Sequence, residues 1–508
     1  MRKKLWLLSG VGILLLSLYF LNPFQTAERE GEEEMDEYEN LEDRFLQQFE
    51  QLKDPALGEI PKHRLVQANE YTKAQKRMSA NSRVAGLSWQ ERGPVYDFVG
   101  PSNGNSRGGA GGYTAGIIVT ALVDLAADPA GNVVFAGSTT GGLWRCTNFL
   151  SSATPPNWQP ITDFSPNISV ASICQNPASP NIMYLATGDG NTNDLRGYGI
   201  WKSTNSGTTW SLLPSTVGFN TAFKILCDNT GNVYLATYGN GLRRSTDGGT
   251  TWTNITPSGL TANANNVTDI ELSSTGRFHA SFGYMGSRVQ HTFTDNPATV
   301  TSGGWTISTG IRKSTQIATR MKIASQGNTL YAVTVNSSFN IDSCYKSIDG
   351  GLNWNLQNAV AYPSALTNGQ GWYNITLQIN PDNANEFIVG GIDAYRSFNE
   401  GASVQRVTQW VSGSPYVHAD HHFMQWYKVG TESRVLIGHD GGISQSYDGG
   451  ISYTDRNQNL GIKQFYSCAI SPTAGIHYLL AGAQDNGVHQ LKNAGLSFST
   501  EVTGGDGA

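Results

Sequence analysis

Long amphipathic helices are missing from residues 110–508, where short alternating apolar runs are bounded by Gly, Asn, Asp and Pro turn signals. Cysteine is scarce as well. The 508 residues include five cysteines, an odd number without a C-x-x-C pair, so neither a disulfide framework nor a thiolate metal site is expected. The net charge is −6 and no basic stripe occurs, so nucleic acid is not an expected partner. These absences favour a β-rich protein.

The few cysteines recur at related places. Cys174, Cys227 and Cys468 lie in the first apolar run of three different sequence repeats, while Cys146 and Cys344 stand elsewhere. Free cysteine behaves as a small apolar residue when it is buried. We therefore expect all five to be buried packing residues, with neither disulfide pairing nor metal ligation.

A short turn pattern recurs along the chain. Its best copy is STDGGTTW, in which Ser245 and Asp247 precede Trp252. The Asp or Asn side chain can accept backbone N–H bonds within its own turn, Gly allows a positive φ, and Trp anchors the exit strand. A worn copy spans residues 397–404. The other structural residues of the pattern are Ser203, Asn205, Trp210, Ser347, Asp349, Trp354, Ser446 and Asp448.

The residue that closes each copy sets a period. Trp158, Trp210, Trp252, Trp305, Trp354, Val404, Tyr453 and Phe498 follow one another at intervals of 42 to 53 residues. Repeats of this length indicate a propeller or a similar array, because one unit cannot bury its apolar face alone. Each interval holds two short strands, a polar turn between them and the recurring turn. The sequence therefore predicts eight blade-like repeats of antiparallel sheet.

The recurring turn resembles the Asp-box, also called the BNR repeat, of sialidases and sortilin-type receptors. The resemblance implies an all-β fold: a β-propeller of four-stranded blades, with the Asp-box between the third and fourth strands of a blade. Eight repeats are visible, and a total of about seven to ten blades is expected. In that family the box is a peripheral fold element, so it implies little about chemistry.

Three segments are expected in chain order. Residues 1–27 combine Met1-Arg-Lys-Lys4 with the apolar run 5–21, which is typical of a signal peptide or an N-terminal membrane anchor. Residues 28–83 form an acidic, partly helical linker, since ten of the residues 28–44 are Asp or Glu. Residues 84–508 form the propeller, which ends abruptly enough to be a fragment. The protein is therefore expected to be secreted or held at the cell envelope, with residues 5–21 as a membrane tether if they are kept.

One candidate site lies in YVHADHHFMQW. On an extended strand His418, Asp420 and His422 would share one face, where two imidazoles and a carboxylate could hold a divalent metal ion. The alternative is a hydrogen-bonded His–Asp pair that lines the channel. His418, Asp420 and His421 are also candidate ligand-binding residues. The metal is the only cofactor that the sequence suggests.

Acids flanked by glycine follow the second strand of several repeats. Asp189, Asp440 and Asp485 occupy equivalent positions, and Asp506 follows in the last repeat. Asp440, Asp485 and Asp506 are candidate catalytic acids, while Asp189, Gln484 and Asn486 are candidate ligand-binding residues. Two carboxylates about 5–10 Å apart across a channel could hydrolyse a glycoside. A simple Asx-turn is the default interpretation of each Asp.

The motif set WQERGP, HADHH, GHDGG, QDNG and GGDG, together with the repeated boxes, resembles exported sortilin-like propeller proteins of Bacteroidetes-type bacteria over residues 40–508. A wider similarity is to the xyloglucan-hydrolase family, which has tandem seven-bladed propellers. Where that family has a catalytic Asp, this chain has Thr139. A hydroxyl cannot perform the task of that carboxylate.

These observations favour an exported binding module that engages a protein, a peptide or a glycan at the cell envelope. A glycoside hydrolase of the xyloglucanase-like type is the alternative, and an assembly factor for a membrane complex, as in the related photosystem II assembly propellers, is a second. Because of Thr139, enzymatic activity is not the favoured interpretation.

Overall fold

The structure is a computed structural model. It describes residues 50, 53–58, 64–79, 113–162, 169–191, 195–219, 221–285, 288–311, 318–358, 360–411, 413–473, 475–492, 499–503 and 505–507. The predicted signal or anchor (1–27) and most of the acidic linker lie outside these ranges.

The chain divides into two compact units, residues 1–62 and 63–508. In the first unit, Asp54 closes a turn by accepting bonds from Ala56 N and Leu57 N at 2.8 and 3.2 Å. The second unit begins with helix α3 (Arg64–Ser79). In the part of the chain that the structure describes, no helix has the length and apolar character needed to cross a membrane.

The all-β fold is confirmed: eight antiparallel sheets of four strands follow one another in the sequence. We call the first seven blades 1 to 7. Blades 1 to 4 consist of β1 (Thr120–Val123), β2 (Val134–Ser138), β3 (Gly142–Cys146), β4 (Trp158–Pro160); β5 (Val170–Gln175), β6 (Met183–Thr187), β7 (Ile200–Ser203), β8 (Ser211–Leu212); β9 (Ala222–Cys227), β10 (Val233–Thr237), β11 (Leu242–Ser245), β12 (Thr253–Asn254); β13 (Val267–Leu272), β14 (Phe278–Phe282), β15 (Gln290–Thr294) and β16 (Thr306–Ile307).

Blades 5 to 7 and the eighth sheet repeat this order. Their strands are β17 (Arg320–Gln326), β18 (Thr329–Val335), β19 (Ile341–Ser347), β20 (Asn355–Leu356); β21 (Thr376–Asn380), β22 (Asn383–Gly390), β23 (Ala394–Ser397), β24 (Gln405–Arg406); β25 (His421–Val429), β26 (Glu432–His439), β27 (Gly442–Ser446), β28 (Thr454–Asp455); β29 (Phe465–Ile470), β30 (Leu479–Ala483), β31 (Val488–Leu491) and β32 (Thr500–Thr503). Short 3-10 helices, η1 (Pro214–Thr216) and η2 (Ser364–Leu366), lie in the loops before blades 3 and 6.

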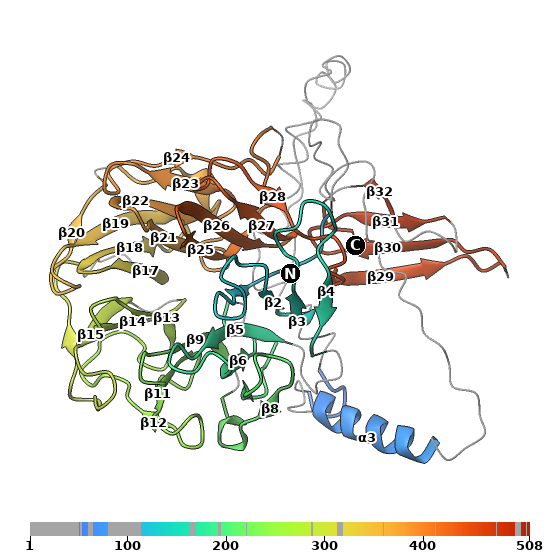
Figure 1. Ribbon diagram of the computed structural model, residues 1–508, viewed down its shortest axis with the longest axis horizontal. Helices are drawn as coiled ribbons and strands as arrows, with labels where there is room; N and C mark the ends of the chain where they lie inside the picture. The colour runs from blue at the N-terminus through green and yellow to red at the C-terminus, as the bar shows by residue number, and fades with distance from the viewer. Residues whose placement is uncertain are drawn as a thin grey trace, which may run out of the picture. The chain divides into compact units, whose positions relative to one another are not determined.

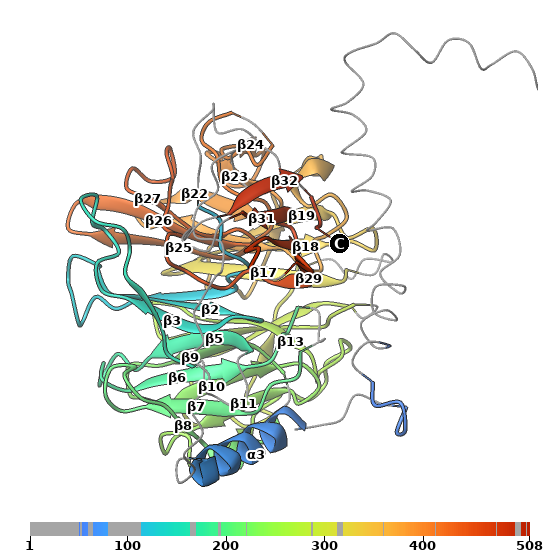
Figure 2. The same cartoon turned by 90° about the vertical axis from the view of Figure 1, so that its right-hand side faces the viewer.

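Seven of the eight sheets form a closed ring. The first strand of each blade is the inner strand, and β1, β5, β9, β13, β17, β21 and β25 each contact the next, with β25 returning to β1. Figures 1 and 2 show these sheets stacked face to face around a common centre. The second strands of blades 1 to 4, β2, β6, β10 and β14, are buried along their whole length because neighbouring blades cover both of their faces.

The hydrophobic core is divided among the seven interfaces of the ring. Seven clusters of buried side chains occur in the described residues, and each joins two neighbouring blades. Aromatic pairs recur at related places: Tyr234 contacts Phe278 and Tyr331 contacts Phe387, with ring centroids 4.6 and 4.8 Å apart. Stacking sheets around a ring thus buries surface that a single blade would expose.

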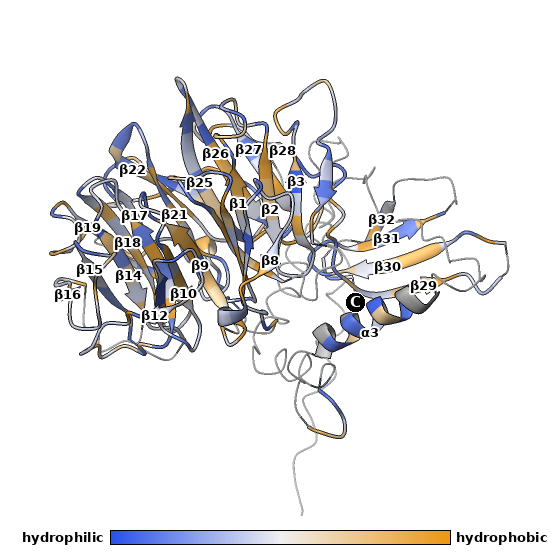
Figure 3. Ribbon diagram, turned by 60° about the horizontal axis from the view of Figure 1, so that its bottom comes forward, coloured by the Kyte–Doolittle hydropathy of each residue, from blue (hydrophilic) through white to orange (hydrophobic). Residues whose placement is uncertain are grey.

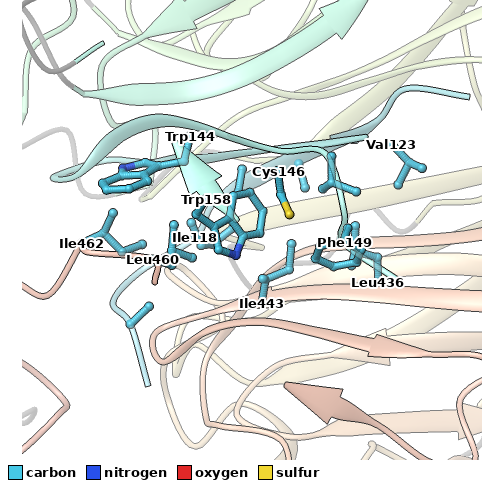
Figure 4. Close-up of a cluster of buried hydrophobic side chains, with 14 of the residues drawn as sticks. Ile118, Val123, Trp144, Cys146, Phe149, Trp158, Leu436, Ile443, Leu460 and Ile462 are labelled. Atoms are coloured by element: carbon cyan, nitrogen blue, oxygen red, sulfur yellow. The ribbon is translucent and has the colours of Figure 1, made fainter. Parts of the chain in front are cut away.

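The cluster between blade 1 and blade 7 closes the ring (Figure 4). Trp158 of β4 is 2% exposed, packs edge-on against Phe149, and donates from Nε1 to Arg456 O at 2.8 Å. Two backbone bonds also join the blades, from Ala115 N to Gly441 O and from Ile118 N to His439 O. Each described blade keeps four consecutive strands, so closure here relies on packing between sheets.

The eighth sheet, β29 to β32, lies beside the ring (Figure 1). None of its described strands packs extensively on an inner strand of the ring. Figure 3 shows hydrophobic residues along β30, as in the ring blades, yet all six residues of β29 are exposed. Cys468 on β29 is therefore exposed, and the expectation that it is buried is wrong, because no blade covers this strand in the described chain.

The recurring turn lies between the third and fourth strands of blades 2, 3, 5, 6 and 7. In blade 5, Ser347 Oγ donates to Asp349 Oδ1 at 2.7 Å and accepts from Gly351 N at 2.9 Å, while Trp354 Nε1 donates to Gly351 O. In the other four turns a glycine N donates in the same way to the Oγ of Ser203, Ser245, Ser397 or Ser446. The turn glycine also packs against the preceding blade, so a local motif helps to set the distance between blades.

Candidate functional site

The ring encloses a central cavity of about 270 Å³ that is lined by residues from the inner strands of all seven blades. Apolar walls from residues such as Ile173 and Met424 alternate with polar side chains. We call the end of the cavity where the inner strands begin the channel mouth. Ligand sites in propeller-like barrels gather where many loops converge, so this cavity is the natural place to look for a site.

β-Bulges shape the channel mouth. The first two strands of blades 2, 3, 4 and 7 each change register, which leaves one inner-strand residue without a pairing partner. These residues are Ala171, Phe223, Thr268 and His422, and all four line the cavity. A bulge redirects a side chain from the regular alternation of the strand. The same local feature therefore turns four side chains from four blades toward one space.

His422 is the bulged residue of blade 7. Its Nε2 lies 2.6 Å from Asp440 Oδ1, and Tyr373 Oη donates to Asp440 Oδ2 at 3.0 Å. Burial opposes protonation of the imidazole, but the Asp440 carboxylate outweighs it and, with Asp420 and Asp189, raises the pKa of His422 above its usual value. Both side chains are almost fully enclosed, at 0% and 2% exposed. The pair is thus a fixed polar element of the channel wall.

Arg320, the first residue of β17, lies across the channel mouth. Its Nη1 donates to Trp372 O and Tyr373 O at 2.7 and 3.1 Å, and its Nη2 donates to Asn191 Oδ1 at 2.8 Å. All of these acceptors are neutral, although the arginine is only 4% exposed. Its Nε has no partner within the described protein. Among the residues that the structure describes, no carboxylate contacts this buried guanidinium.

Two further polar atoms at the cavity are unpartnered. His422 Nδ1 and Thr376 Oγ1 make no hydrogen bond within the described chain, and both residues line the cavity together with Arg320. Buried polar atoms without partners are rare and costly in proteins. Three such atoms around one cavity indicate a site where a polar ligand would supply their missing hydrogen-bond partners.

A charged cluster lies deeper on the strands of blades 3 to 5. Lys224 Nζ contacts Asp269 and Glu271 at 3.0 and 3.3 Å, and Lys322 Nζ is 3.7 Å from Asp269. Burial lowers the pKa of Lys322 to about 8, because one shared carboxylate compensates it only in part. The two lysines and two carboxylates of this cluster balance in charge, and Lys322 is the less closely paired of the two lysines.

The predicted metal site is not formed. No three His, Cys, Asp or Glu side chains in the described ranges are placed to hold a metal ion. The prediction assumed one strand through His418, Asp420 and His422, but β25 begins at His421, Asp420 has a φ of +65°, and the bulge at His422 breaks the alternation. His418 instead stacks on His439, with ring centroids 5.9 Å apart.

The remaining histidine and acid of this motif are also enclosed. Asp420 Oδ1 accepts a hydrogen bond from Asn374 Nδ2. His421 is fully buried, and burial lowers its pKa to about 3, so it stays neutral. Asp189 lines the cavity, and its Oδ1 accepts from Asn191 N at 2.9 Å in the Asx-turn that the sequence allowed. Of the predicted ligand-binding residues, Asp189 therefore lies at the cavity itself.

The other predicted acids meet at the junction of blade 7 and the eighth sheet. Asn486 Nδ2 donates to Asp440 O at 3.2 Å and to Gln484 O at 2.8 Å. Asp485 N donates to Asp506 Oδ1 at 2.7 Å. The side chain of Asp440 is hydrogen-bonded to His422 and Tyr373. The bond from Asp485 N to Asp506 joins the loop after β30 to the segment after β32. The structure gathers these residues, but their observed bonds are those of a structural junction.

Four charged residues of the channel were not predicted from the sequence: Arg320, Lys322, Lys224 and Asp269. A signal was present, because charged residues alternate within the inner strands of three successive repeats, in FKI, TDIEL and RMKIA, where apolar residues are expected. Thr139, which stands where a related family has a catalytic acid, lines the cavity and is 3% exposed.

Comparisons with known proteins show the fold. No family model matches the chain, and no curated protein matches it. Among solved structures, a GH74 enzyme from Niastella koreensis is similar at 18% identity and a TM-score of 0.53, covering 78% of this chain and 60% of that one. An ancestral GH74 enzyme is 16% identical, with a TM-score of 0.52 and coverage of 78% and 54%. YCF48 bound to D1 peptide is 14% identical, with a TM-score of 0.45 and coverage of 67% and 95%.

This chain therefore spans less than two thirds of the length of the two GH74 enzymes. At such identities the likeness establishes a β-propeller fold and leaves the function to be argued from the site.

Proposed function

We propose that this chain is a ligand-binding β-propeller that receives a carboxylate group of a protein or peptide at its channel mouth. Arg320 carries the proposal. Buried charges in proteins are ordinarily paired, yet this guanidinium contacts neutral oxygens alone and keeps its Nε unbonded within the described chain. An incoming carboxylate would supply both the missing charge and the missing acceptor.

The geometry of the guanidinium suits that group. Nη1 is committed to two backbone carbonyls, whereas Nη2 has one partner and Nε has none among the described residues. The Nε–Nη2 edge can therefore donate two parallel bonds to the two oxygens of a carboxylate. Lys322, which also lines the cavity and has a partly compensated charge, would add attraction deeper in the channel.

The lining favours a protein or peptide over a glycan. Sugar sites commonly offer open aromatic faces for stacking. Beside the cavity, Tyr284 and Tyr373 use their hydroxyls in bonds to the surrounding protein and are almost fully buried. The partly exposed rings that line the cavity are Phe223, which packs edge-on against Tyr284, and Phe423. A slender chain end or an acidic side chain fits such a lining.

Binding is also favoured over glycoside hydrolysis. A hydrolase of the expected type needs two carboxylates that face the same bond. Asp440 is 2% exposed and bonded to His422 and Tyr373, so it is not presented to a substrate. No observation in the described chain favours an assembly-factor role over other binding roles.

The test measures binding of peptide pairs that differ only in a free or an amidated C-terminal carboxylate, by fluorescence polarisation with the full chain. Arg320→Gln should weaken binding of the free-carboxylate peptides by roughly 10- to 100-fold, the value of one hydrogen-bonded charge. Arg243→Gln is the matched control, because Arg243 donates to Asn240 O and does not line the cavity.

Equal binding by Arg320→Gln and the unchanged protein would refute the role of Arg320, provided that circular dichroism shows both to be folded. Binding of uronic-acid oligosaccharides in place of peptides would show that the ligand is a glycan. Export to the cell envelope remains part of the proposal, supported by residues 1–27. Recovery of the protein only with cytoplasmic markers after cell fractionation would contradict it.

A further inference from the structure

Two cysteine thiols are in contact between blades 2 and 3 of the ring. Cys174 ends the hydrophobic part of β5, Cys227 is the last residue of β9, and their Sγ atoms lie 3.3 Å apart. Both cysteines are free in the structure. They belong to neighbouring blades, although 53 residues separate them in the sequence. The sequence pattern indicated two separate packing residues, because the contact arises only when two repeats stack.

The strands that carry the two thiols are held in register. Ile225 N of β9 donates to Ser172 Oγ of β5 at 3.2 Å, two residues before each cysteine. The inner strands of blades 2 and 3 pack along their length. A disulfide bond needs its sulfurs at roughly 2.0 Å, so the two sulfurs have to move closer by a little over about 1 Å before they can bond.

The two thiols differ in access. Cys174 is buried, whereas Cys227 is partly exposed. Burial first, and then the neighbouring Cys227, raise the pKa of Cys174 well above its usual value. The more accessible Cys227 should therefore meet an external reagent first. Once Cys227 is in a mixed disulfide it cannot carry a negative charge. The contribution of Cys227 to the raised pKa of Cys174 is then removed.

We propose that Cys174 and Cys227 form a reversible disulfide that staples blade 2 to blade 3 when the protein meets a disulfide oxidant. The Cys227 thiolate attacks the oxidant, forms a mixed disulfide and releases one thiolate. The Cys174 sulfur then attacks Cys227 Sγ, the S–S bond between Cys227 and the oxidant breaks, and a second thiol leaves with the proton from Cys174. The two electrons and two protons of the cysteines thus pass to the oxidant.

The other cysteines provide internal references. Cys146 is buried and its Sγ donates to Asn148 Oδ1 at 3.3 Å, and Cys344 is buried in another blade. Cys468 is exposed on the eighth sheet. Among the described cysteines, no other pair of thiols is in contact. An internal cross-link should therefore be specific to one pair, and Cys468→Ser removes the thiol most able to link two molecules.

The experiment uses the full chain with Cys468→Ser, incubated with oxidised or reduced glutathione, alkylated in denaturant and digested with trypsin. Cleavage after Lys202 separates the two cysteines, so a disulfide appears as two linked peptides that reduction separates. The oxidised protein should lose two alkylation sites, hold no glutathione, and melt at a higher temperature than the reduced protein.

Glutathione retained on Cys227 without a cross-link, or full alkylation of both cysteines after oxidation, would overturn the proposal. Cys174→Ser is the matched variant. It should trap glutathione on Cys227, because no second thiol is present to release it. The main experiment uses a protein that keeps both Cys174 and Cys227. Its outcome therefore does not depend on whether the Cys174→Ser variant folds.

Discussion

Replacing Trp158 with alanine should weaken the ring at the contact between blade 1 and blade 7. The indole is 2% exposed, lies in the cluster that both blades build, and donates to Arg456 O at 2.8 Å. Truncating a buried Trp costs about 3–5 kcal/mol, which includes the cavity left behind. Trp158→Phe keeps most of the apolar contact but leaves the Arg456 carbonyl unbonded, at a cost of about 1–2 kcal/mol.

Urea unfolding followed by tryptophan fluorescence and circular dichroism would measure these differences. The matched control is Trp210→Ala, because Trp210 is only partly buried and its Nε1 donates to Gly207 O within its own turn. We expect the Trp158→Ala variant to lose clearly more free energy of unfolding than the Trp210→Ala variant. Equal losses, or a loss below about 1 kcal/mol for Trp158→Ala, would refute closure through this contact.

Two further predictions follow from the same architecture. Deleting residues 464–508 should leave the melting temperature of the ring nearly unchanged in calorimetry, because no ring cluster in the described chain includes the eighth sheet; loss of cooperative melting would contradict this. Burial raises the pKa of Asp393 to about 7, only partly offset by Arg406 and Thr408. The folded protein therefore binds more protons than the unfolded chain between about pH 4 and pH 7, and this contribution to stability is lost as the pH rises through 7. Asp393→Asn should flatten that dependence in unfolding curves at pH 4.5 and 8, by about 1.4 kcal/mol per pKa unit at most, and an unchanged slope would count against it.

The sequence was sufficient for the blades because each one is a local unit. The recurring turn marks five of the repeats, and the closing residue, aromatic in seven of the eight, returns at a regular interval. The closure was not visible, since the eighth repeat has the same pattern as the other seven. What selects seven is a long-range contact, in which Trp158 and the segment around Ile118 meet blade 7.

The site was only partly accessible for similar reasons. Asp189 and His422 were singled out and do line the cavity. The metal prediction failed because strand alternation cannot reveal a bulge, and the bulge decides where His422 points. Arg320 is held at the cavity by the carbonyls of residues 372 and 373 in the next blade and by Asn191 across the channel. No local sequence pattern brings these groups together.

The contact that closes the ring also determines an order of events during synthesis. The partner of Trp158 lies 298 residues further along the chain, and Ala130 is separated from Arg434 by 304 residues. At about 5–20 residues per second, translation needs roughly 15–60 s to deliver that partner. During this interval blades 1 to 6 can form only an open arc with the apolar edge of blade 1 uncovered. Newly made protein should therefore be most prone to aggregation, and most dependent on chaperones, just before blade 7 emerges.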